Sequence, residues 1–341
     1  MNVESLNFGI VVCVSPGDYL FGKGTCASIR HFMPDVPIAV LVDGQVDTTL
    51  LEKTYDRLTV IRKANVDDPW LREHSFGWGI TKMLAFFYAP FEYFLYLDSD
   101  TILWGNICDR IDPAQYDYIA DIPNHQGKSE ISREEVGTWF FDPDFVEATF
   151  PDFPWQQYQN QFMCPGVFFG SQHTFSLEEY KDMLSLKLKN PYSLHFGDMG
   201  FHNLMVFKKF HENQLNLGFA DFQVIFPEFS QNELRQRFSV SDNQPQVIPG
   251  DEQILHMPDK KPLVNNPECY SEPMTYFRLK FLEDSEGLTG EPAMQRLVEE
   301  DQDYFRLRKQ SLLRKRLGMM GRLLQGNRAE WQHFLQRFGL R

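Results

Sequence analysis

Short apolar runs alternate with polar, helix-like segments along the first two thirds of the chain. Each apolar run ends at turn residues, as buried strands do, and the segments between several of them are long enough for helices. We expect strands over 8–14, 37–42, 58–62, 91–97, 118–122 and 164–170, and helices over 25–32, 81–88 and 176–187. This alternation predicts an α/β fold with a mostly parallel sheet flanked by helices.

The remaining segments have less regular patterns. Residues 123–163 are rich in aromatic residues with little periodicity, and residues 227–253 look loop-rich. From Pro273 the pattern is helical to the end of the chain, with breaks expected near 287–290 and at Gly318 and Gly321. We therefore expect one α/β domain over 1–270 and a helical C-terminal extension over 271–341.

Composition places the chain among globular proteins of a reducing compartment. Of its 341 residues, 43% are hydrophobic, which is enough for a substantial core. Its five cysteines are scattered without a C-x-x-C pair, which indicates neither a disulfide framework nor a zinc site. Neither a signal-peptide core nor an 18-residue apolar stretch occurs, so we expect a cytoplasmic protein.

Charge is distributed unevenly along the chain. Residues 305–341 carry ten Lys or Arg against Glu330, a charge of +9, which leaves −23 on the other 304 residues of a chain whose net charge is −14. An acidic body argues against nucleic acid as the main partner. Leucines and aromatics alternate with basic residues in this tail. The pattern fits a helix lying on an anionic membrane surface, and it equally fits a helix packing on the acidic body or on another subunit.

Two carboxylates interrupt the apolar run F-L-Y-L-D-S-D-T-I-L, at Asp98 and Asp100. In open α/β sheets, ligands bind beyond the carboxyl ends of strands, which is where the strand 91–97 places both acids. Hard carboxylate oxygens suit Mg²⁺ or Mn²⁺. The alternative is that one aspartate only caps the next turn.

A histidine stands at the end of a later apolar run, in Q-I-L-H-M-P-D-K-K-P. His256 there, joined to two carboxylates, favours Mn²⁺ over Mg²⁺, and the nearby Lys260 and Lys261 offer positive charge to phosphate. The alternative is a histidine with a purely structural role.

Together these segments resemble glycosyltransferase family 8, which includes glycogenin and bacterial lipopolysaccharide galactosyl- and glucosyltransferases. The matching segments are T-K-M at 81–83, F-L-Y-L-D-S-D-T at 94–101, P-G-V-F-F-G at 165–170, G-D-M-G-F-H-N at 197–203 and I-L-H with K-P at 254–262. The resemblance implies a GT-A fold and a retaining transfer of a hexose from a nucleotide diphosphate sugar to a glycan or lipid-linked saccharide.

The resemblance also implies roles for individual residues. Asp98, Asp100 and His256 would hold the metal, with Mn²⁺ expected and Mg²⁺ as the second choice. Lys82 and Lys261 would face the donor phosphates, together with Asp98 and Ser99. Asp198 would face the sugar near the reacting carbon.

The sequence departs from the family in four places. The loop 15–19 lacks the acid and amide that bind the nucleotide base in the family. The expectation of a uridine donor therefore rests on analogy alone. Met199 replaces a glutamine after Asp198, Cys164-Pro165 replaces a common Asn-x, and the glycine after His256 is missing. Asp198 has an alternative role as the N-cap of a helix over 199–208.

Other functions stay open at this point. Gly17–Gly24 nearly spells a phosphate-binding P-loop, although its central residues are bulky and Gly24 offers no hydroxyl. A haloacid-dehalogenase-type phosphatase would need its threonine one place later than Thr101. His195, Asp198 and His202 have the spacing of a metal site. The aromatic segment 139–162 is either an acceptor platform, or it packs as core or closes a lid. The whole chain is alternatively a carbohydrate-binding protein without turnover.

Overall fold

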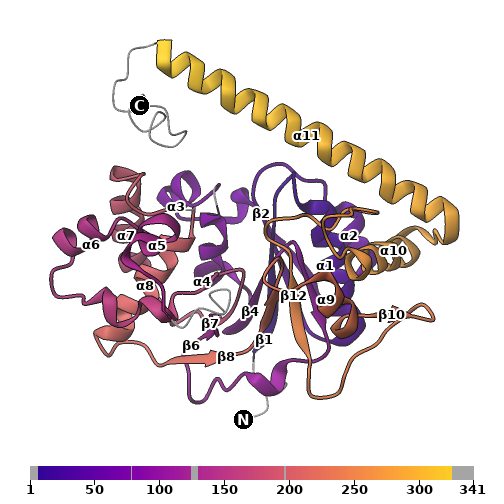
Figure 1. Ribbon diagram of the computed structural model, residues 1–341, viewed down its shortest axis with the longest axis horizontal. Helices are drawn as coiled ribbons and strands as arrows, with labels where there is room; N and C mark the ends of the chain where they lie inside the picture. Colours follow the sequence, from indigo (N-terminus) through magenta and orange to yellow (C-terminus); the bar gives the residue numbers. More distant parts are fainter. Residues whose placement is uncertain (1–6, 78, 124–129, 196, 325–341) are drawn as a thin grey trace.

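The computed structural model of the protein describes residues 7–77, 79–123, 130–195 and 197–324, with backbone alone from 310 onward. A seven-stranded sheet in the order β3-β2-β1-β4-β7-β6-β8 forms its centre (Figure 1). The strands are β1 (Phe8–Val14), β2 (Ile38–Val42), β3 (Leu58–Ile61), β4 (Tyr93–Asp98), β6 (Tyr118–Asp121), β7 (Val167–Ser171) and β8 (Leu217–Ala220). Within this sheet β7 is antiparallel to both of its neighbours and the other pairs are parallel. The expected mixed, mostly parallel sheet is confirmed.

Helices cover both faces of this sheet (Figure 1). The α-helices of the described residues are α1 (Tyr19–Phe32), α2 (Thr49–Thr54), α3 (Pro69–His74), α4 (Ala85–Tyr88), α5 (Arg133–Trp139), α6 (Pro143–Thr149), α7 (Leu177–Lys189), α8 (Met199–His211), α9 (Gln231–Arg237), α10 (Glu272–Glu286) and α11 (Gly290–Leu324). Alternate residues of one strand enter different cores. In β1, Ile10 and Val12 pack with α1 and α10, whereas Val11 packs with the core under α4 and α8.

The first helix begins six residues earlier than expected. Helix α1 starts at Tyr19, so most of the Gly17–Gly24 segment is helical rather than a loop. A Cβ at Gly22 would lie 2.5 Å from Val14 Cγ1, and one at Gly24 would lie 2.6 Å from Met274 Sδ, so these glycines serve close packing. The side chain of Lys23 pairs with Glu300. The P-loop interpretation is therefore wrong.

A second, three-stranded sheet joins segments that are far apart in the sequence. Its order is β5 (Thr101–Trp104), β12 (Gln253–His256) and β9 (Gln223–Ile225). A two-stranded hairpin consists of β10 (Val240–Ser241) and β11 (Gln244–Pro245). Residues 227–253 were expected to be loop-rich, but they include α9 and this hairpin. Both elements have too few apolar residues to give a clear hydrophobic period in the sequence.

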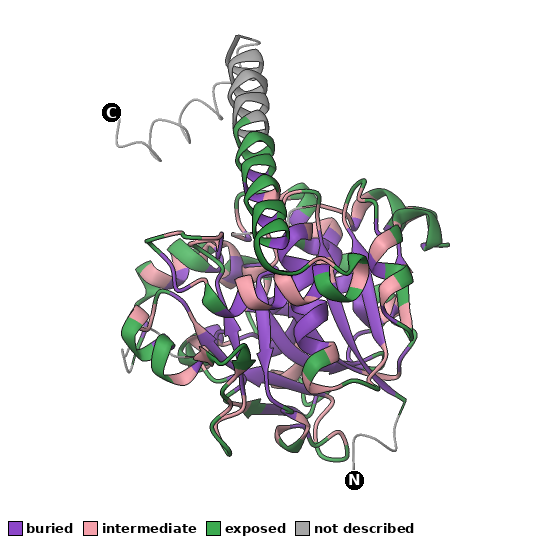
Figure 2. Cartoon of the chain, turned by 90° about the vertical axis from the view of Figure 1, so that its right-hand side faces the viewer, coloured by how far each residue is buried: buried purple, intermediate pink, exposed green. Residues whose placement is uncertain are grey.

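Two helices form the C-terminal part. Helix α10 packs on α1, and Arg278, which is fully buried, pairs with Glu300 and Asp301 at the base of α11. The expected break at 287–290 is confirmed, since Gly287 and Gly290 have φ of 68° and 63°. The expected breaks at Gly318 and Gly321 are wrong, because α11 continues to Leu324. Figure 2 shows α11 standing out from the body. Residues 325–341 lie outside the described part, and the division at residue 270 stays a prediction.

The aromatic segment is mainly core. Phe140, Phe141, Phe153, Trp155 and Phe162 are all buried. The core interpretation is confirmed for these rings, and they offer no exposed platform to a sugar.

Candidate metal and donor site

Asp98, Asp100 and His256 come together at the carboxyl end of the central strands. One ligand atom from each residue lies within 4.8 Å of the others. The Nε2 atom of His256 is 3.4 Å from Asp100 Oδ1 and 3.9 Å from Asp98 Oδ2. His256 is 156 positions after Asp100 in the sequence, and the structure brings it to the two aspartates as expected.

The strand pairing explains this convergence. Asp98 is the last residue of β4, and a tight turn leads to Thr101 at the start of β5. Strand β12 is antiparallel to β5 in a register that places His256 opposite Thr101. The hydroxyl of Thr25 in α1 lies 2.6 Å from the Ser99 carbonyl oxygen and 2.7 Å from that of Thr101, which ties the turn to α1.

Charged neighbours keep Asp100 ionised. Burial opposes its ionisation, but the ammonium group of Lys261, in direct contact with Oδ2, and the nearby His256 hold the pKa of Asp100 below its usual value. In the same way Asp100 holds the pKa of Lys261 above its usual value, against the effect of burial. Lys260 is instead 2.7 Å from Glu268 at the surface.

Burial would favour a neutral His256, but the nearby carboxylate of Asp100 outweighs it and the pKa of the imidazole rises to about 10. Its Nδ1 lies 2.8 Å from Gln223 Oε1. Its Nε2 is buried and has no hydrogen bond. Without a metal the ring is therefore a cation, and a divalent cation bound at Nε2 would displace the proton from that nitrogen.

These residues fit a divalent cation. Two carboxylates and an imidazole form a mixed O/N donor set that suits Mn²⁺ and also accommodates Mg²⁺. Gly166 keeps the space beside them open, since a Cβ there would lie 2.2 Å from His256 Cε1 and 3.0 Å from Asp98 Oδ2. A methyl group at this position would collide with the donor atoms.

Lys82 links the metal residues to Asp198. Its Nζ lies 3.1 Å from Asp98 Oδ1 and 2.8 Å from Asp198 Oδ2. Burial favours the neutral amine, but the two carboxylates raise the pKa of Lys82 above its usual value. The Tyr96 hydroxyl donates to Asp98 Oδ1 at 2.7 Å. Lys82 is therefore a cation enclosed by acids at the floor of the site.

Asp198 does not cap the helix that follows it. It precedes α8, but its side chain makes no capping hydrogen bond, so the N-cap interpretation is wrong. Burial raises its pKa, and Lys82 opposes that shift. Gly79, with a φ of 80°, makes room for it, because a Cβ there would lie 2.4 Å from Asp198 Oδ1.

Three successive backbone carbonyls hold the site together. The carbonyl of Cys164 accepts from Gln223 Nε2 at 3.2 Å, that of Pro165 from Lys82 Nζ at 2.8 Å, and that of Gly166 from the Asp98 amide at 2.8 Å. Segment 165–170 belongs to the expected family resemblance, whereas Gln223 is a residue of the site that the sequence pattern does not predict. The available signal was a polar residue inside the apolar run F-Q-V-I-F at 222–226.

The other candidate sites do not form. Among the described residues, the only group of three or more potential metal ligands is Asp98, Asp100 and His256, so the site at His195, Asp198 and His202 is not found. His202 lies among aromatic rings, with Nε2 3.1 Å from the Tyr118 hydroxyl.

The Thr101 hydroxyl donates to the Asp98 carbonyl at 2.7 Å, which gives it a structural role in the turn. Ser99 is buried in the same turn, and its part in donor binding stays a prediction.

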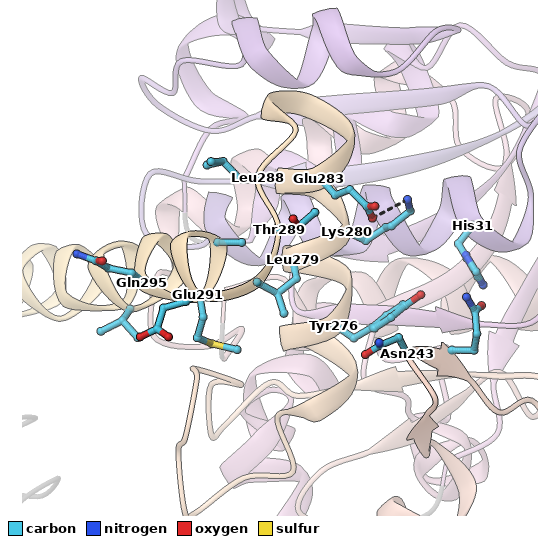
Figure 3. Close-up of a pocket in the computed structure, with 15 residues that line it drawn as sticks. His31, Asn243, Tyr276, Leu279, Lys280, Glu283, Leu288, Thr289, Glu291 and Gln295 are labelled. Carbon is cyan, nitrogen blue, oxygen red and sulfur yellow. Dashed lines mark hydrogen bonds and ion pairs between the residues drawn. The ribbon is translucent and has the colours of Figure 1, made fainter.

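A large hollow lies elsewhere on the molecule, between α10, the start of α11 and the β10–β11 hairpin (Figure 3). It has a volume of about 1150 Å³, and its charged lining includes Lys280, which pairs with Glu283 at 3.0 Å. None of the metal-site residues lines it. Size alone therefore does not identify the functional site in this protein.

Comparison with solved structures identifies the fold. An active-site mutant of LgtC matches with a TM-score of 0.52 and 14% identity over 84% of this chain and 99% of that one. The bifunctional glycosyltransferase WbbM matches with a TM-score of 0.51 and 10% identity over 80% of this chain and 50% of that one. GlyE of Streptococcus pneumoniae TIGR4 matches with a TM-score of 0.50 and 13% identity over 86% of this chain and 63% of that one.

No family model matches the chain, and no curated protein matches its sequence. The structures named here are glycosyltransferases, and this chain shares their GT-A fold. The fold expected from the resemblance is confirmed.

Proposed function

We propose that the protein is a metal-dependent glycosyltransferase. It moves a hexose from a nucleotide diphosphate sugar, with UDP as the expected nucleotide, to a hydroxyl of a glycan or lipid-linked saccharide. The observation that carries this proposal is the Asp98, Asp100 and His256 cluster at the carboxyl end of the sheet, in a fold shared with glycosyltransferases. A galactosyltransferase LgtC of this fold has been solved with donor and acceptor sugar analogs.

Asp98, Asp100 and His256 would hold Mn²⁺, or Mg²⁺ in its place. When bound, the cation supplies Lewis-acid neutralisation of the leaving diphosphate. The protein's own part is to present fixed charge where negative charge develops. Lys261 contacts Asp100 at the edge of the cluster, and Lys82 lies 3.1 Å from Asp98, so both ammonium groups can face the diphosphate without moving far.

Asp198 is the residue we propose to face the sugar. Its carboxylate is 13% exposed and is held by Lys82, which fixes its position. A fixed negative charge near the anomeric carbon stabilises the positive charge that develops there as the diphosphate departs. We propose that the transfer retains the anomeric configuration, as the family resemblance implies.

The C-terminal segment is the proposed membrane contact. No helix in the described residues is both long and apolar enough to span a bilayer. The basic, apolar pattern of 305–341 supports a peripheral attachment to an anionic membrane on its cytoplasmic side. Such a location would bring the site close to a lipid-linked acceptor.

The proposal is tested with a panel of UDP-, GDP-, ADP- and CDP-sugars, each with and without Mn²⁺. We expect one nucleotide class to raise the melting temperature only when Mn²⁺ is present, and to be hydrolysed or transferred slowly. The double variant Asp98→Ala with Asp100→Ala should lose both effects. Unchanged nucleotide-sugar turnover in that variant would overturn the proposal. Binding of metal and nucleotide without any product would indicate a carbohydrate-binding protein instead of an enzyme.

A further inference from the structure

We propose that Gln223 is a positioning residue for His256: it holds the imidazole in one orientation with Nδ1 protonated, so that Nε2 faces Asp98 and Asp100. Its Oε1 lies 2.8 Å from His256 Nδ1, and its Nε2 lies 3.2 Å from the Cys164 carbonyl oxygen. The inference rests on the proposed function, because it concerns the same metal site.

The neighbours of the Gln223 amide fix which way it points. The Cys164 carbonyl can only accept a hydrogen bond, so the NH₂ group of Gln223 must face it. The Gln223 carbonyl oxygen then faces the imidazole, and this oxygen also only accepts. His256 must therefore keep a proton on Nδ1, so Nε2 is the nitrogen that can give up its proton and bind a cation.

Gln223 is itself firmly held. It begins β9, which pairs with β12 in a register that places Ile225 opposite His256. The carboxylate of Asp121 accepts from the backbone amides of Phe222 and Gln223, at 2.9 and 3.0 Å. The side chain of Gln223 is buried together with that of His256. The amide therefore has little freedom to leave the ring.

The position of Gln223 also joins the two sheets at the site. Its carbonyl oxygen reaches His256 at the end of β12, while its NH₂ group reaches the segment before β7 of the main sheet. That segment also binds the amide of Asp98 through the Gly166 carbonyl. One side chain thus sets the ring of His256 relative to the strand that carries Asp98.

The test compares cation binding by the full chain and its variants without nucleotide sugar, with Mn²⁺ alone as the probe. Gln223→Met keeps the volume and removes both hydrogen bonds, and we expect its Mn²⁺ affinity to fall by roughly 10- to 100-fold. Gln223→Glu keeps an acceptor for Nδ1–H and should stay within about threefold of the parent protein. Gln253→Met is the matched control, because Gln253 is buried on β12 and bonds to Asp221 rather than to the ring.

A second measurement separates positioning from a structural role. In protein labelled with ¹⁵N-histidine and loaded with diamagnetic Zn²⁺, the parent should show His256 with a protonated Nδ1 and a metal-bound Nε2. Gln223→Met should show a mixture of ring states, which a loss of stability alone would not produce. If this variant does not fold, Gln223→Asn carries the test, since its amide is one methylene short of the ring.

The outcomes are distinct. Equal Mn²⁺ affinity in Gln223→Met and the parent, with an unchanged ¹⁵N pattern, would overturn the role of Gln223 and leave the metal site intact. Failure of the parent protein to bind Mn²⁺ or Zn²⁺ at all would overturn the metal site of the proposed function, and this inference with it.

Discussion

Lys82 and Asp198 form an ion pair inside the protein, with Lys82 Nζ 2.8 Å from Asp198 Oδ2. The same ammonium group is 3.1 Å from Asp98 Oδ1. The ammonium group of Lys82 thus pairs both with Asp98 of the metal cluster and with Asp198, the residue proposed to face the sugar. The distance between these two carboxylates therefore depends on Lys82, which makes this residue a structural element of the site as well as a source of charge.

Removing this cation should destabilise the fold. Lys82→Met leaves the partly buried carboxylates of Asp98 and Asp198 without their partner, and we expect the free energy of unfolding to fall by about 3–5 kcal/mol. Urea denaturation measures this loss. Adding Asp198→Asn to Lys82→Met should restore part of the stability, because it removes one of the unpaired charges. An equal or larger loss in the double variant would contradict this account.

An exposed pair gives the matched control for that experiment. The side chains of Arg296 and Glu299 are about half exposed, and their closest atoms are 3.9 Å apart. Arg296→Met should change the free energy of unfolding by less than about 1 kcal/mol, since exposed ion pairs contribute little.

Gly166→Ala should weaken metal binding while leaving most of the fold intact. The added Cβ would lie 2.2 Å from His256 Cε1, so the imidazole must move away from the carboxylates. We expect Mn²⁺ affinity, measured by calorimetry, to fall on the order of tenfold or more. Gly17→Ala is the control, because the nearest atom to its Cβ would be 3.8 Å away. Similar affinities in both variants would show that the ring does not need this space.

The main sheet and the convergence of Asp98, Asp100 and His256 were predictable from the sequence, for a physical reason. Strands β1, β2 and β4 are buried on both faces, so their apolar runs are continuous and end sharply at polar residues such as Asp98. The order β3-β2-β1-β4 and the carboxyl-end rule then place Asp98 and Asp100 in a crevice.

What the sequence did not predict depends on long-range pairing. Strand β9 has only three residues. It positions Gln223 beside His256 through its register with β12, and no local sequence pattern predicts that register. For the same reason Gln223 went unnoticed beside His256. The early start of α1 was missed because Gly22 and Gly24 look like loop residues, whereas they allow close packing on Val14 and Met274.

Asp121 should make the stability of the protein depend on pH. Burial raises its pKa to about 7, and hydrogen bonds from the backbone amides of Gln223 and Phe222 only partly oppose this. The folded state therefore holds a proton that the unfolded chain releases near pH 4. Between about pH 4 and pH 7 the folded state binds more protons than the unfolded chain, so the free energy of unfolding falls as pH rises. The stabilising contribution of Asp121 is therefore complete below about pH 4 and is lost by about pH 7.

Asp121→Asn removes this titration and keeps the Oδ1 acceptor that both backbone amides use. The variant should gain stability over the parent as pH rises from 5 to 8, by roughly 2.5 kcal/mol, which is about two pH units of the shift at 1.36 kcal/mol each. Urea denaturation at four pH values in this range measures the difference. A difference that does not change with pH would show that Asp121 ionises at its ordinary value in the folded protein.

The two parts of α11 should behave differently when the chain is shortened. Its base is fixed to the body, since Arg278 lies 3.2 Å from Glu300 and 2.8 Å from Asp301, and Asp301 accepts from the Val264 amide at 2.7 Å. Beyond Tyr304, whose ring packs against Phe21 at 5.6 Å, the side chains of Phe305 and Leu307 are exposed. The boundary between docked and projecting helix therefore lies near residue 305.

Deleting residues 305–341 removes the part of α11 beyond Tyr304, the residues that follow it and nine units of net positive charge, but none of these docking contacts. Donor hydrolysis and the melting temperature should stay close to those of the parent protein. Binding to vesicles with anionic lipid at low salt should be lost, because basic residues near such a surface contribute about 1 kcal/mol each. Co-sedimentation with anionic and neutral vesicles measures the loss of membrane binding. As a control, Arg278→Met disrupts the docked base of α11 and should lower the melting temperature instead. Unchanged sedimentation of the shortened chain with anionic vesicles would show that another surface of the protein binds the membrane.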